Sequence, residues 1–379
     1  MEHKTRIKGN VHYVGVNDRN KHRFEGMWPL PYGVSYNSYL IDDEMVALVD
    51  TVDICYFEVY LRKIKQVIGE RPINYLIINH MEPDHSGSIR LIKQHYPEII
   101  IVGNKQTFGM IEGFYGVTGE QYLVKEGDFL ALGHHKLRFY MTPMVHWPET
   151  MMTFDETDGV LFSGDGFGCF GTVDGGFLDT RINVDKYWGE MVRYYSNIVG
   201  KYGSPVQKAL QKLGGLPISA ICSTHGPVWT ENIAKVIGIY DRLSRYDADE
   251  GVVIAYGSMY GNTEQMAEAI AEELSAQGVK NIVMHNVTKS HPSYIIADIF
   301  RYKGLIIGSP TYSNQIFPEV EALLSKILLR EVKGRYLGYF GSFTWAGAAV
   351  KRLAEFAEKS KFELVGDPVE MKQAMRDIT

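Results

Sequence analysis

Two histidines and two carboxylates lie within six positions of this chain, in the stretch NHMEPDHSG. His80, Glu82, Asp84 and His85 follow directly after the apolar run Ile73–Ile78. In extended chain, residues two positions apart share a face, so alternate side chains of this stretch can point toward one place. Imidazole and carboxylate groups gathered in this way are ligands for a metal ion. Taken alone, the stretch could also be a polar loop in which the aspartate caps a helix.

Three more potential ligands each follow an apolar run elsewhere in the first half. His146 follows LRFYMTP, Asp165 follows VLFSG, and His225 comes just after SAIC. Individually each is more often a turn residue or a hydrogen-bonded histidine. Jointly, four strand ends that supply histidines and carboxylates predict a metal site.

The first half alternates short apolar runs with Gly, Pro and Asp, which is typical of strands. TMMTFDETDGVLFSGD has an Asp-Gly turn between two such runs and predicts a hairpin. Helices are expected at 58–68 and 186–195, where apolar residues recur every three or four positions. Strands with some antiparallel pairs and interspersed helices predict an α/β sandwich.

The second half follows a strict alternation. Strands are expected at 252–256, 281–286, 304–308, 336–341 and 362–365, with helices at 263–276, 293–302, 317–328 and 346–359 between them. This order predicts parallel crossovers and a doubly wound sheet. The polar passage before residue 249 marks the expected boundary between domains 1–248 and 249–379. The final residues leave room for only a short last helix, which raises the question of a truncated or frayed C-terminal end.

Three loops follow strands of this second sheet at its carboxyl edge, where open parallel sheets bind ligands. The first loop leads directly into a helix and can hold a phosphate with backbone N–H groups and hydroxyls. The other two loops offer aromatic faces to a flat heterocycle. The chain has no G-x-G-x-x-G motif opening a strand-helix unit, which argues against NAD or FAD as the ligand. The candidate contacts are Ser258, Met259, Tyr260, Gly261, Asn262 and Thr263, then Pro310, Thr311, Tyr312, Ser313 and Asn314, then Ser342, Phe343, Thr344, Trp345, Ala346 and Gly347.

These loops resemble those with which flavodoxins bind FMN, although Tyr260 replaces the usual middle threonine of the first loop. The first half resembles the metallo-β-lactamase fold, whose hydrolases carry H-x-H-x-D-H and two metals. This chain has H-x-E-x-D-H, and the carboxylate of Glu82 favours iron over a nitrogen-rich zinc site. With both halves in this order, the chain resembles the flavodiiron proteins. The resemblance implies an N-terminal metallo-β-lactamase-like αββα sandwich followed by a flavodoxin-like doubly wound sheet.

The resemblance also implies the ligand set and the cofactors, FMN and two iron ions in a non-haem diiron centre. His80, Glu82 and His146 would bind one iron, Asp84 and His225 the other, and Asp165 would bridge them. His85 is a ligand in only some members, and we place it outside the ligand set. Phe24, Glu25, Trp147 and Tyr195 are candidates for the pocket wall, although core packing is favoured for Tyr195.

The implied activity is reduction of dioxygen to water, of nitric oxide to nitrous oxide, or of both. The implied electron donor is rubredoxin or another small carrier, with a deazaflavin as an alternative. A head-to-tail homodimer or dimer of dimers would bring one subunit's flavin to the other's metal site, with Trp345 close to it. Two other functions stay open: a zinc-dependent hydrolase with an accessory flavin domain, and a non-enzymatic flavin electron shuttle.

The bulk composition of the 379 residues excludes other classes. With 39 Lys and Arg against 45 Asp and Glu, the chain lacks the basic excess of nucleic-acid binding proteins. No apolar run approaches the length of a membrane span and the N-terminus is polar, so we expect a cytoplasmic protein without membrane contact. Its 3 cysteines are widely spaced. We expect buried thiols and neither a disulfide framework nor a thiolate metal site.

Overall fold

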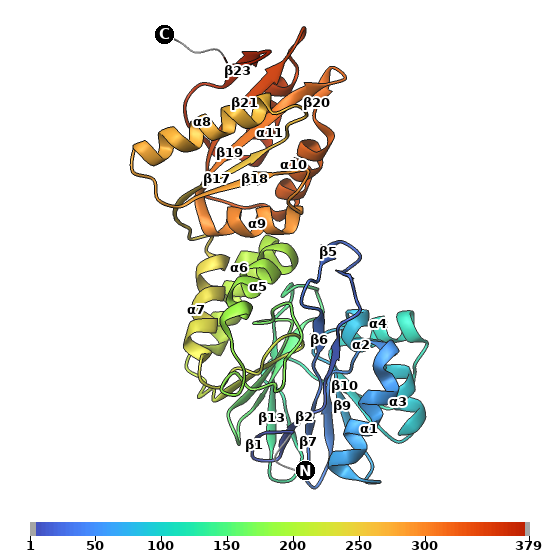
Figure 1. The fold of residues 1–379 in the computed structure, drawn as a ribbon. Coiled ribbons are helices and arrows are strands. Elements are labelled where there is room, and N and C mark those ends of the chain that lie inside the picture. Colours follow the sequence, from blue (N-terminus) through green and yellow to red (C-terminus); the bar gives the residue numbers. More distant parts are fainter. Residues whose placement is uncertain (1–4, 376–379) are drawn as a thin grey trace. The chain divides into compact units, whose positions relative to one another are not determined.

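The computed structural model describes residues 5–375, which form two compact units. The first unit runs to Tyr194 and includes Ser204–Asp241, whereas the second combines Tyr195–Gly203 with the chain from Arg242 onward (Figure 1). The chain therefore enters the second unit briefly before it returns to finish the first.

The first unit is built on two facing sheets. The larger has the order β1-β2-β7-β8-β9-β10-β11, formed by Arg6–Lys8, Val11–Tyr13, Tyr39–Ile41, Ala47–Val49, Tyr75–Ile77, Ile100–Gly103 and Gln121–Leu123. The other has the order β12-β13-β14-β15-β16, formed by Phe129–Ala131, Lys136–Met141, Met151–Asp155, Val160–Gly164 and Ala220–Ser223. Two short ribbons, β3 with β6 (Val16–Asp18, Val34–Tyr36) and β4 with β5 (Arg23–Phe24, Trp28–Pro29), complete the strands of this unit.

Apolar residues of both sheets meet in one core. Tyr39 and Ile77 of the first sheet are fully or almost fully buried with Phe139 and Phe162 of the second. The predicted hairpin is present, since β14 pairs with β15 in antiparallel register. Because each sheet turns one apolar face inward, its outer face needs helices to cover it.

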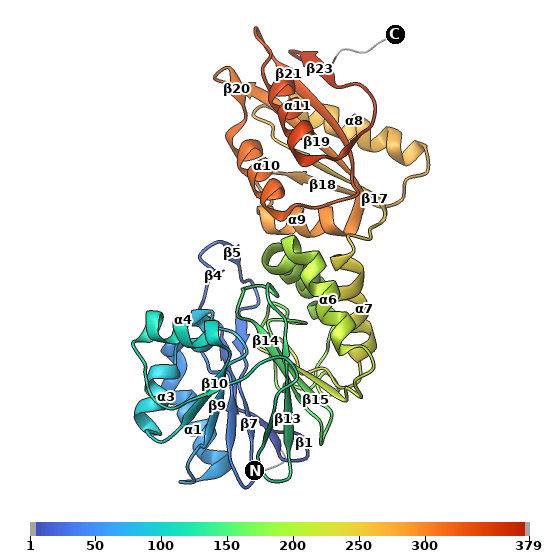
Figure 2. The ribbon, with the colours of Figure 1, turned by 180° about the vertical axis from the view of Figure 1, so that it is seen from behind.

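Helices cover the outside of this sandwich (Figures 1 and 2). Helices α1 (Phe57–Ile68), α3 (Ile89–His95) and α4 (Lys105–Tyr115) lie along the first sheet, and α5 (Asp185–Tyr194), α6 (Gly203–Leu213) and α7 (Ile233–Ser244) lie on the side of the second. The buried residues of α1 recur at three- and four-residue spacing. The predicted αββα sandwich is confirmed, although the apolar spacing in the sequence indicates only two of its helices.

The second unit is a parallel sheet with the order β18-β17-β19-β21-β22. These strands are Ile282–Asn286, Asp249–Tyr256, Tyr302–Tyr312, Tyr336–Phe343 and Glu363–Leu364, and the helices are α8 (Asn262–Ala276), α9 (Pro292–Arg301), α10 (Pro318–Arg330) and α11 (Ala349–Ser360). Helix α8 lies on one face of the sheet, and α10 and α11 lie on the other (Figures 1 and 2). The predicted doubly wound architecture is confirmed.

The end of this unit differs from the expectation of a short last helix. Residues Val369–Lys372 form strand β23, which continues the sheet edge by pairing in parallel with Phe340–Phe343 of β21. Strand β20 (Gln315–Ile316) folds back onto β19 as a small hairpin. Residues 376–379, on which the question of a frayed terminus depends, lie outside the described residues.

In the described part of the chain, no helix has the length and apolar character needed to cross a bilayer. Cys169 and Cys222 are buried as expected. Cys55 is exposed, so the expectation of three buried thiols is wrong at that position. It lies in the short turn of helix just before α1, which is on the surface of the first unit.

Candidate metal centre and flavin site

The ends of four strands bring the predicted metal ligands together in the first unit. Strand β9 leads to His80 and then to α2 (Pro83–Ser86), which carries Asp84 and His85, while β13, β15 and β16 lead to the other three segments. The six predicted ligands, His80, Glu82, Asp84, His146, Asp165 and His225, are all buried, and so is His85.

One oxygen of Asp165 faces the first group of donors. Its Oδ2 lies 3.0 Å from Nε2 of His146 and 3.7 Å from Nε2 of His80. The Nε2 atoms of His80 and His146 are 3.4 Å apart, and Glu82 Oε2 lies 3.1 Å from His146 Nε2. These four side chains therefore converge on one point.

The other oxygen of Asp165 faces a second group. Its Oδ1 lies 3.6 Å from Nε2 of His225 and 3.1 Å from Nε2 of His85. Asp84 Oδ2 lies 3.2 Å from the His225 nitrogen, and Asp84 Oδ1 lies 3.4 Å from the His85 nitrogen. Asp165 thus lies between two sets of donors and presents one oxygen to each, with Oδ1 also accepting a hydrogen bond from Thr224.

Hydrogen bonds behind the rings orient two of the histidines. His80 Nδ1 donates to Glu149 Oε1 over 2.7 Å, and His225 Nδ1 donates to the backbone carbonyl of Ser35 over 2.7 Å. Because Nδ1 of each ring carries the donated proton, Nε2 is left with a lone pair that points into the cluster.

Several of these buried ligand atoms make no hydrogen bond among the described residues, and their contacts given above are close approaches between charged or ionisable groups. They include both carboxylate oxygens of Asp84, both ring nitrogens of His85 and Nε2 of His225. Buried polar atoms are normally paired, since leaving them unpaired costs free energy. Unpaired lone pairs converging on two neighbouring points fit the binding of two cations, which the mixed histidine and carboxylate set suits.

Mutual contacts shift the pKa values of the central groups. Burial opposes protonation of His146, but its hydrogen bonds with Asp165 and Glu82 outweigh burial and raise its pKa well above the usual range. Burial alone would raise the pKa of Asp165, yet the charge of His85 and the hydrogen bond with His146 hold it well below its ordinary value. Protons and metal ions therefore compete for the same atoms.

A cavity of about 540 Å³ opens onto Glu82 and Asp84. Phe24 and Glu25 line it as predicted, together with Lys21. This cavity gives a route from solvent to the donors of both groups.

The aromatic rings around the cluster only partly match the prediction. The Trp147 ring packs edge-on against His80, with ring centroids 5.3 Å apart. Tyr195, in contrast, belongs to the second unit and packs near Phe300, so the favoured core packing of this residue is correct. Its neighbour Tyr194 instead has its ring centroid 5.8 Å from that of His225. The sequence alone does not predict which of these adjacent tyrosines faces the metal cluster, because that depends on the register of the helix.

The three loops of the second unit line a single pocket of about 370 Å³ at the carboxyl edge of the sheet. Residues of all three predicted loops contribute, and Gln373, which follows β23, is an addition that the sequence did not suggest. Gly261 and Gly347 are not part of the pocket lining. Gly261 adopts the left-handed backbone conformation that starts α8, which suits glycine.

The pocket has two chemically different parts. At the α8 end, Ser258 Oγ accepts a hydrogen bond from the Gly261 N–H over 3.1 Å, and the hydroxyls of Thr263 and Ser342 lie 2.9 Å apart. Helix N-termini with nearby hydroxyls bind phosphate groups. At the rim, Tyr260 and Trp345 are 91% and 84% exposed, so they leave large aromatic faces available to a flat ring system.

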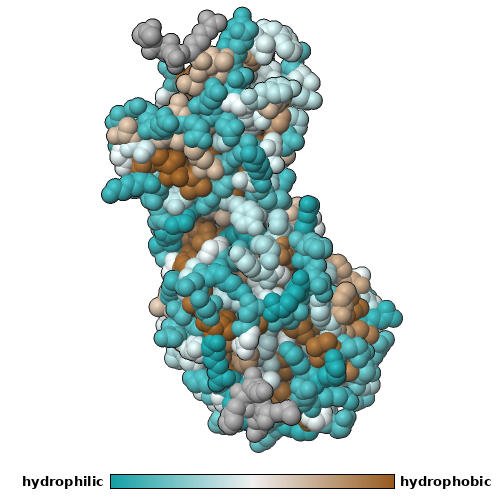
Figure 3. All heavy atoms as spheres, viewed as in Figure 1, coloured by the Kyte–Doolittle hydropathy of each residue, from teal (hydrophilic) through white to brown (hydrophobic). Residues whose placement is uncertain are grey.

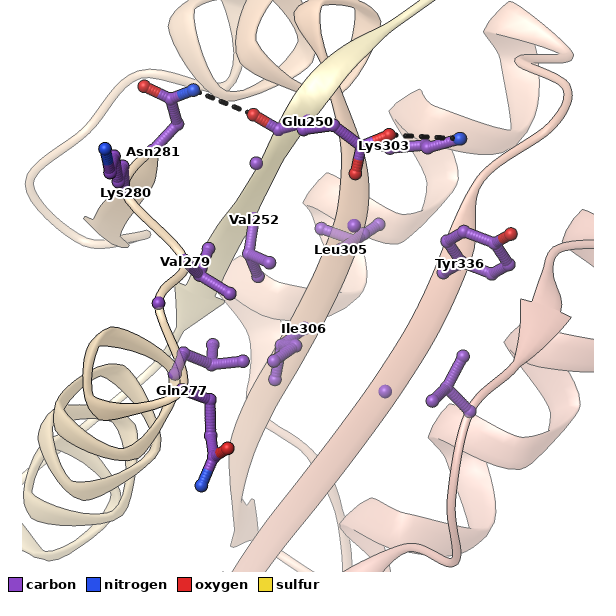
Figure 4. Close-up of a pocket in the computed structure, with 16 residues that line it drawn as sticks. Glu250, Val252, Gln277, Val279, Lys280, Asn281, Lys303, Leu305, Ile306 and Tyr336 are labelled. Carbon is purple, nitrogen blue, oxygen red and sulfur yellow. Dashed lines mark hydrogen bonds and ion pairs between the residues drawn. The ribbon is translucent and has the colours of Figure 1, made fainter.

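A larger cavity, of about 620 Å³, lies elsewhere on the second unit, between α8 and the sheet. Figure 4 shows Val252 and Ile306 on neighbouring strands in this cavity and the ion pair of Lys303 with Glu250, 3.2 Å long, beside them. Figure 3 shows a hydrophobic patch on this unit beneath α8. Apolar surface dominates here and none of the grouped metal-ligating side chains found in the described chain is present, so we assign no chemistry to it.

Family models match both halves of the chain. A family described as ODP family beta lactamase matches residues 34–226, and the flavodoxin family matches residues 254–377. Each model falls on one of the two architectures described above.

Known proteins are similar to the whole chain. The anaerobic nitric oxide reductase flavorubredoxin of Vibrio vulnificus (strain YJ016) is 32% identical over 94% of this chain and 73% of its own length. The rubredoxin oxygen:oxidoreductase of Desulfovibrio gigas is 31% identical, with a TM-score of 0.93 over 97% of this chain and 92% of that one. The flavodiiron protein of Giardia intestinalis is 28% identical, also with a TM-score of 0.93, over 97% and 91%.

Proposed function

Because this chain belongs to the flavodiiron protein family, we propose that it reduces dioxygen to water, nitric oxide to nitrous oxide, or both, with electrons that pass through FMN to a non-haem diiron centre. Relatives that match nearly the whole chain are named as a nitric oxide reductase and an oxygen oxidoreductase. A zinc hydrolase and a simple electron shuttle are not favoured by these relatives. The donor set is the same for either gas, so the proposal covers both.

The observation that carries this proposal is the position of Asp165. Its two oxygens face two separate donor groups, as expected of a carboxylate that bridges two metal ions. We propose that His80, Glu82 and His146 bind one iron, that Asp84 and His225 bind the other, and that Asp165 bridges them. His85 lies 3.1 Å from Asp165 Oδ1 and is therefore close enough to the second position to affect it.

The proposed reaction needs electrons from the cofactors and ligand atoms that the protein holds in place. Two ferrous irons and a two-electron-reduced flavin would together supply four electrons, the number that converts dioxygen and four protons into two water molecules. His80 and His225 are held in one tautomer by the groups behind them, so they present their Nε2 atoms without rearrangement. Phe24, Phe170 and Tyr194 pack together beside His225 and form an apolar wall on that side of the cluster.

We also propose the cofactor contacts, the domain limits and the partners. Residues 1–248 would form the diiron domain and 249–379 the FMN domain, which uses the three loops from Ser258 to Thr263, Pro310 to Asn314 and Ser342 to Gly347. The donor would be rubredoxin or a similarly small carrier, since the names of two relatives refer to rubredoxin. A head-to-tail homodimer or dimer of dimers would place Trp345 near the metal site of the other subunit.

The test combines composition with gas consumption. Purified protein is assayed for iron and FMN per chain, reduced anaerobically by a rubredoxin system, and mixed with dioxygen or nitric oxide in separate experiments. We expect about two irons and one flavin per chain and rapid consumption of at least one gas. Protein that holds both cofactors yet consumes neither gas would refute the activity. Light scattering of the same sample measures the oligomeric state, and a monomer at assay concentration would refute the proposed dimer.

A further inference from the structure

We propose that Glu149 is a positioning residue for His80, and that its buried charge makes the two metal positions unequal, with the His80 side binding a metal ion more tightly than the His225 side. This inference rests on the proposed metal centre. It adds a residue outside the ligand set and a ranking of the two positions.

The contact itself is short and fully enclosed. Glu149 and His80 are both 0% exposed, and Glu149 Oε1 accepts from His80 Nδ1 over 2.7 Å and from the Met81 N–H over 2.9 Å. A carboxylate that holds both the ring and the adjacent backbone fixes the position and tautomer of the imidazole. It also makes the imidazole a stronger electron donor toward a metal on its other nitrogen.

Glu149 is held in place by its own segment. Its backbone carbonyl accepts from Asn104 Nδ2 over 2.5 Å, which anchors the HWPET segment to the start of α4. That segment also carries His146, so the same loop provides one donor of the His80 side and the group behind another. Glu149 Oε2 is buried and has no hydrogen-bond partner in the described structure, so the hydrogen bonds to this carboxylate, from His80 and from the Met81 N–H, both go to Oε1.

The equivalent position on the other side is neutral. His225 Nδ1 donates to the backbone carbonyl of Ser35, a dipole without net charge. Both histidines thus have one ring nitrogen fixed, but only His80 has an anion behind it. In a buried environment, where charges are weakly screened, a full negative charge attracts a cation more strongly than a carbonyl dipole does.

The test uses the metal-free protein and cobalt(II) alone, because the visible bands of cobalt(II) report its coordination. Wild-type protein should bind cobalt(II) in two steps of unequal affinity. Glu149→Gln keeps the size of the side chain and an oxygen for His80 but removes the charge. We expect it to weaken the tighter step by about 10- to 100-fold, to leave the weaker step unchanged, and to alter the bands of the first equivalent.

Asp179→Asn is the matched control. Asp179 is also a buried carboxylate of the first unit, which accepts hydrogen bonds from Thr230 and Asn232, but it belongs to none of the groups of metal-ligating side chains found in the described chain. A general loss of stability from removing a buried charge should affect both variants, whereas the weakening of the tighter step should occur only in Glu149→Gln. Circular dichroism of each metal-free variant checks that it is folded.

A second pair of variants ranks the positions even if Glu149→Gln does not fold. Glu82→Gln should remove the tighter step, and Asp84→Asn should remove the weaker one. The proposal is overturned if Asp84→Asn removes the tighter step, if the two wild-type steps are equal, or if Glu149→Gln leaves the tighter step and its bands unchanged. Failure of the wild type to bind any cobalt(II) would instead refute the metal centre itself.

Discussion

Replacement of Asp165 by asparagine should abolish the stabilisation that metal ions give to the first unit. Asp165 presents one oxygen to each donor group, at 3.0 Å from His146 Nε2 and 3.6 Å from His225 Nε2. An amide of the same shape cannot supply two anionic oxygens, so both positions should lose affinity. Variants that alter one group, Glu82→Gln and Asp84→Asn, should each affect only one position.

The size of the effect follows from linkage between binding and folding. A ligand at 100 times its dissociation constant stabilises the folded state by about 2.7 kcal/mol per site. For a unit of roughly 150 to 250 residues, 1 kcal/mol corresponds to about 2–4 °C in Tm. Each occupied position should therefore raise the Tm of the first unit by about 5–11 °C, and two positions by about twice that amount.

The assay is calorimetry of each protein under anaerobic conditions, with excess ferrous iron and again with a chelator. The quantity compared is the difference in Tm between the two conditions, which cancels the effect of each substitution on the metal-free fold. We expect the full difference in wild type, only part of it in the variants of Glu82 and Asp84, with the smaller part left in Glu82→Gln because that variant loses the tighter position, and almost none in Asp165→Asn. The bridging role is wrong if Asp165→Asn keeps half or more of the wild-type difference.

Three more outcomes test other parts of the structure. Burial raises the pKa of Asp179, but hydrogen bonds from residues 230–232 outweigh burial and hold this pKa below its ordinary value. The stability that Asp179 contributes should therefore be present above about pH 4 and be lost as the pH falls through its folded pKa. Between pH 5 and 2, Asp179→Asn should lose less Tm than wild type does. The buried side chain of Arg335 donates hydrogen bonds to five backbone carbonyls. Because a lysine ammonium cannot reach all of them, Arg335→Lys should lower the unfolding free energy of the second unit, measured in urea melts, by about 2–4 kcal/mol. A loss below roughly 0.5 kcal/mol would contradict this role. Trp345→Ala should weaken FMN binding by roughly tenfold in fluorescence titrations, because the flavin loses an aromatic face. Leu329→Ala alters an exposed residue outside the pocket and should leave the FMN affinity unchanged. Equal FMN affinities of the two variants would exclude a contact between Trp345 and the flavin.

The pattern of strand ends makes the candidate site predictable from the sequence. A short apolar run followed by a histidine or a carboxylate can be recognised locally, so His80, Asp165 and His225 are identified without knowledge of their distances. Glu82 is equally local, and because the hydrolases that the first half resembles have a histidine there, its carboxylate already favours iron. The strict alternation after residue 249 likewise predicts the parallel sheet and the edge at which its three loops meet.

The tertiary structure alone decided the groups behind these ligands. Glu149 looks like any surface glutamate in HWPET, and only the packing of that segment against the strand end before His80 turns it into a buried acceptor. Tyr194 and Tyr195 differ by one helical position, about 100°, which places them in different units. Val369–Lys372 became a strand rather than a helix because β21 offered an unpaired edge. In each case the deciding contact joins residues far apart in the chain or depends on a helix face, whereas the ligand types and their spacing are properties of the sequence itself.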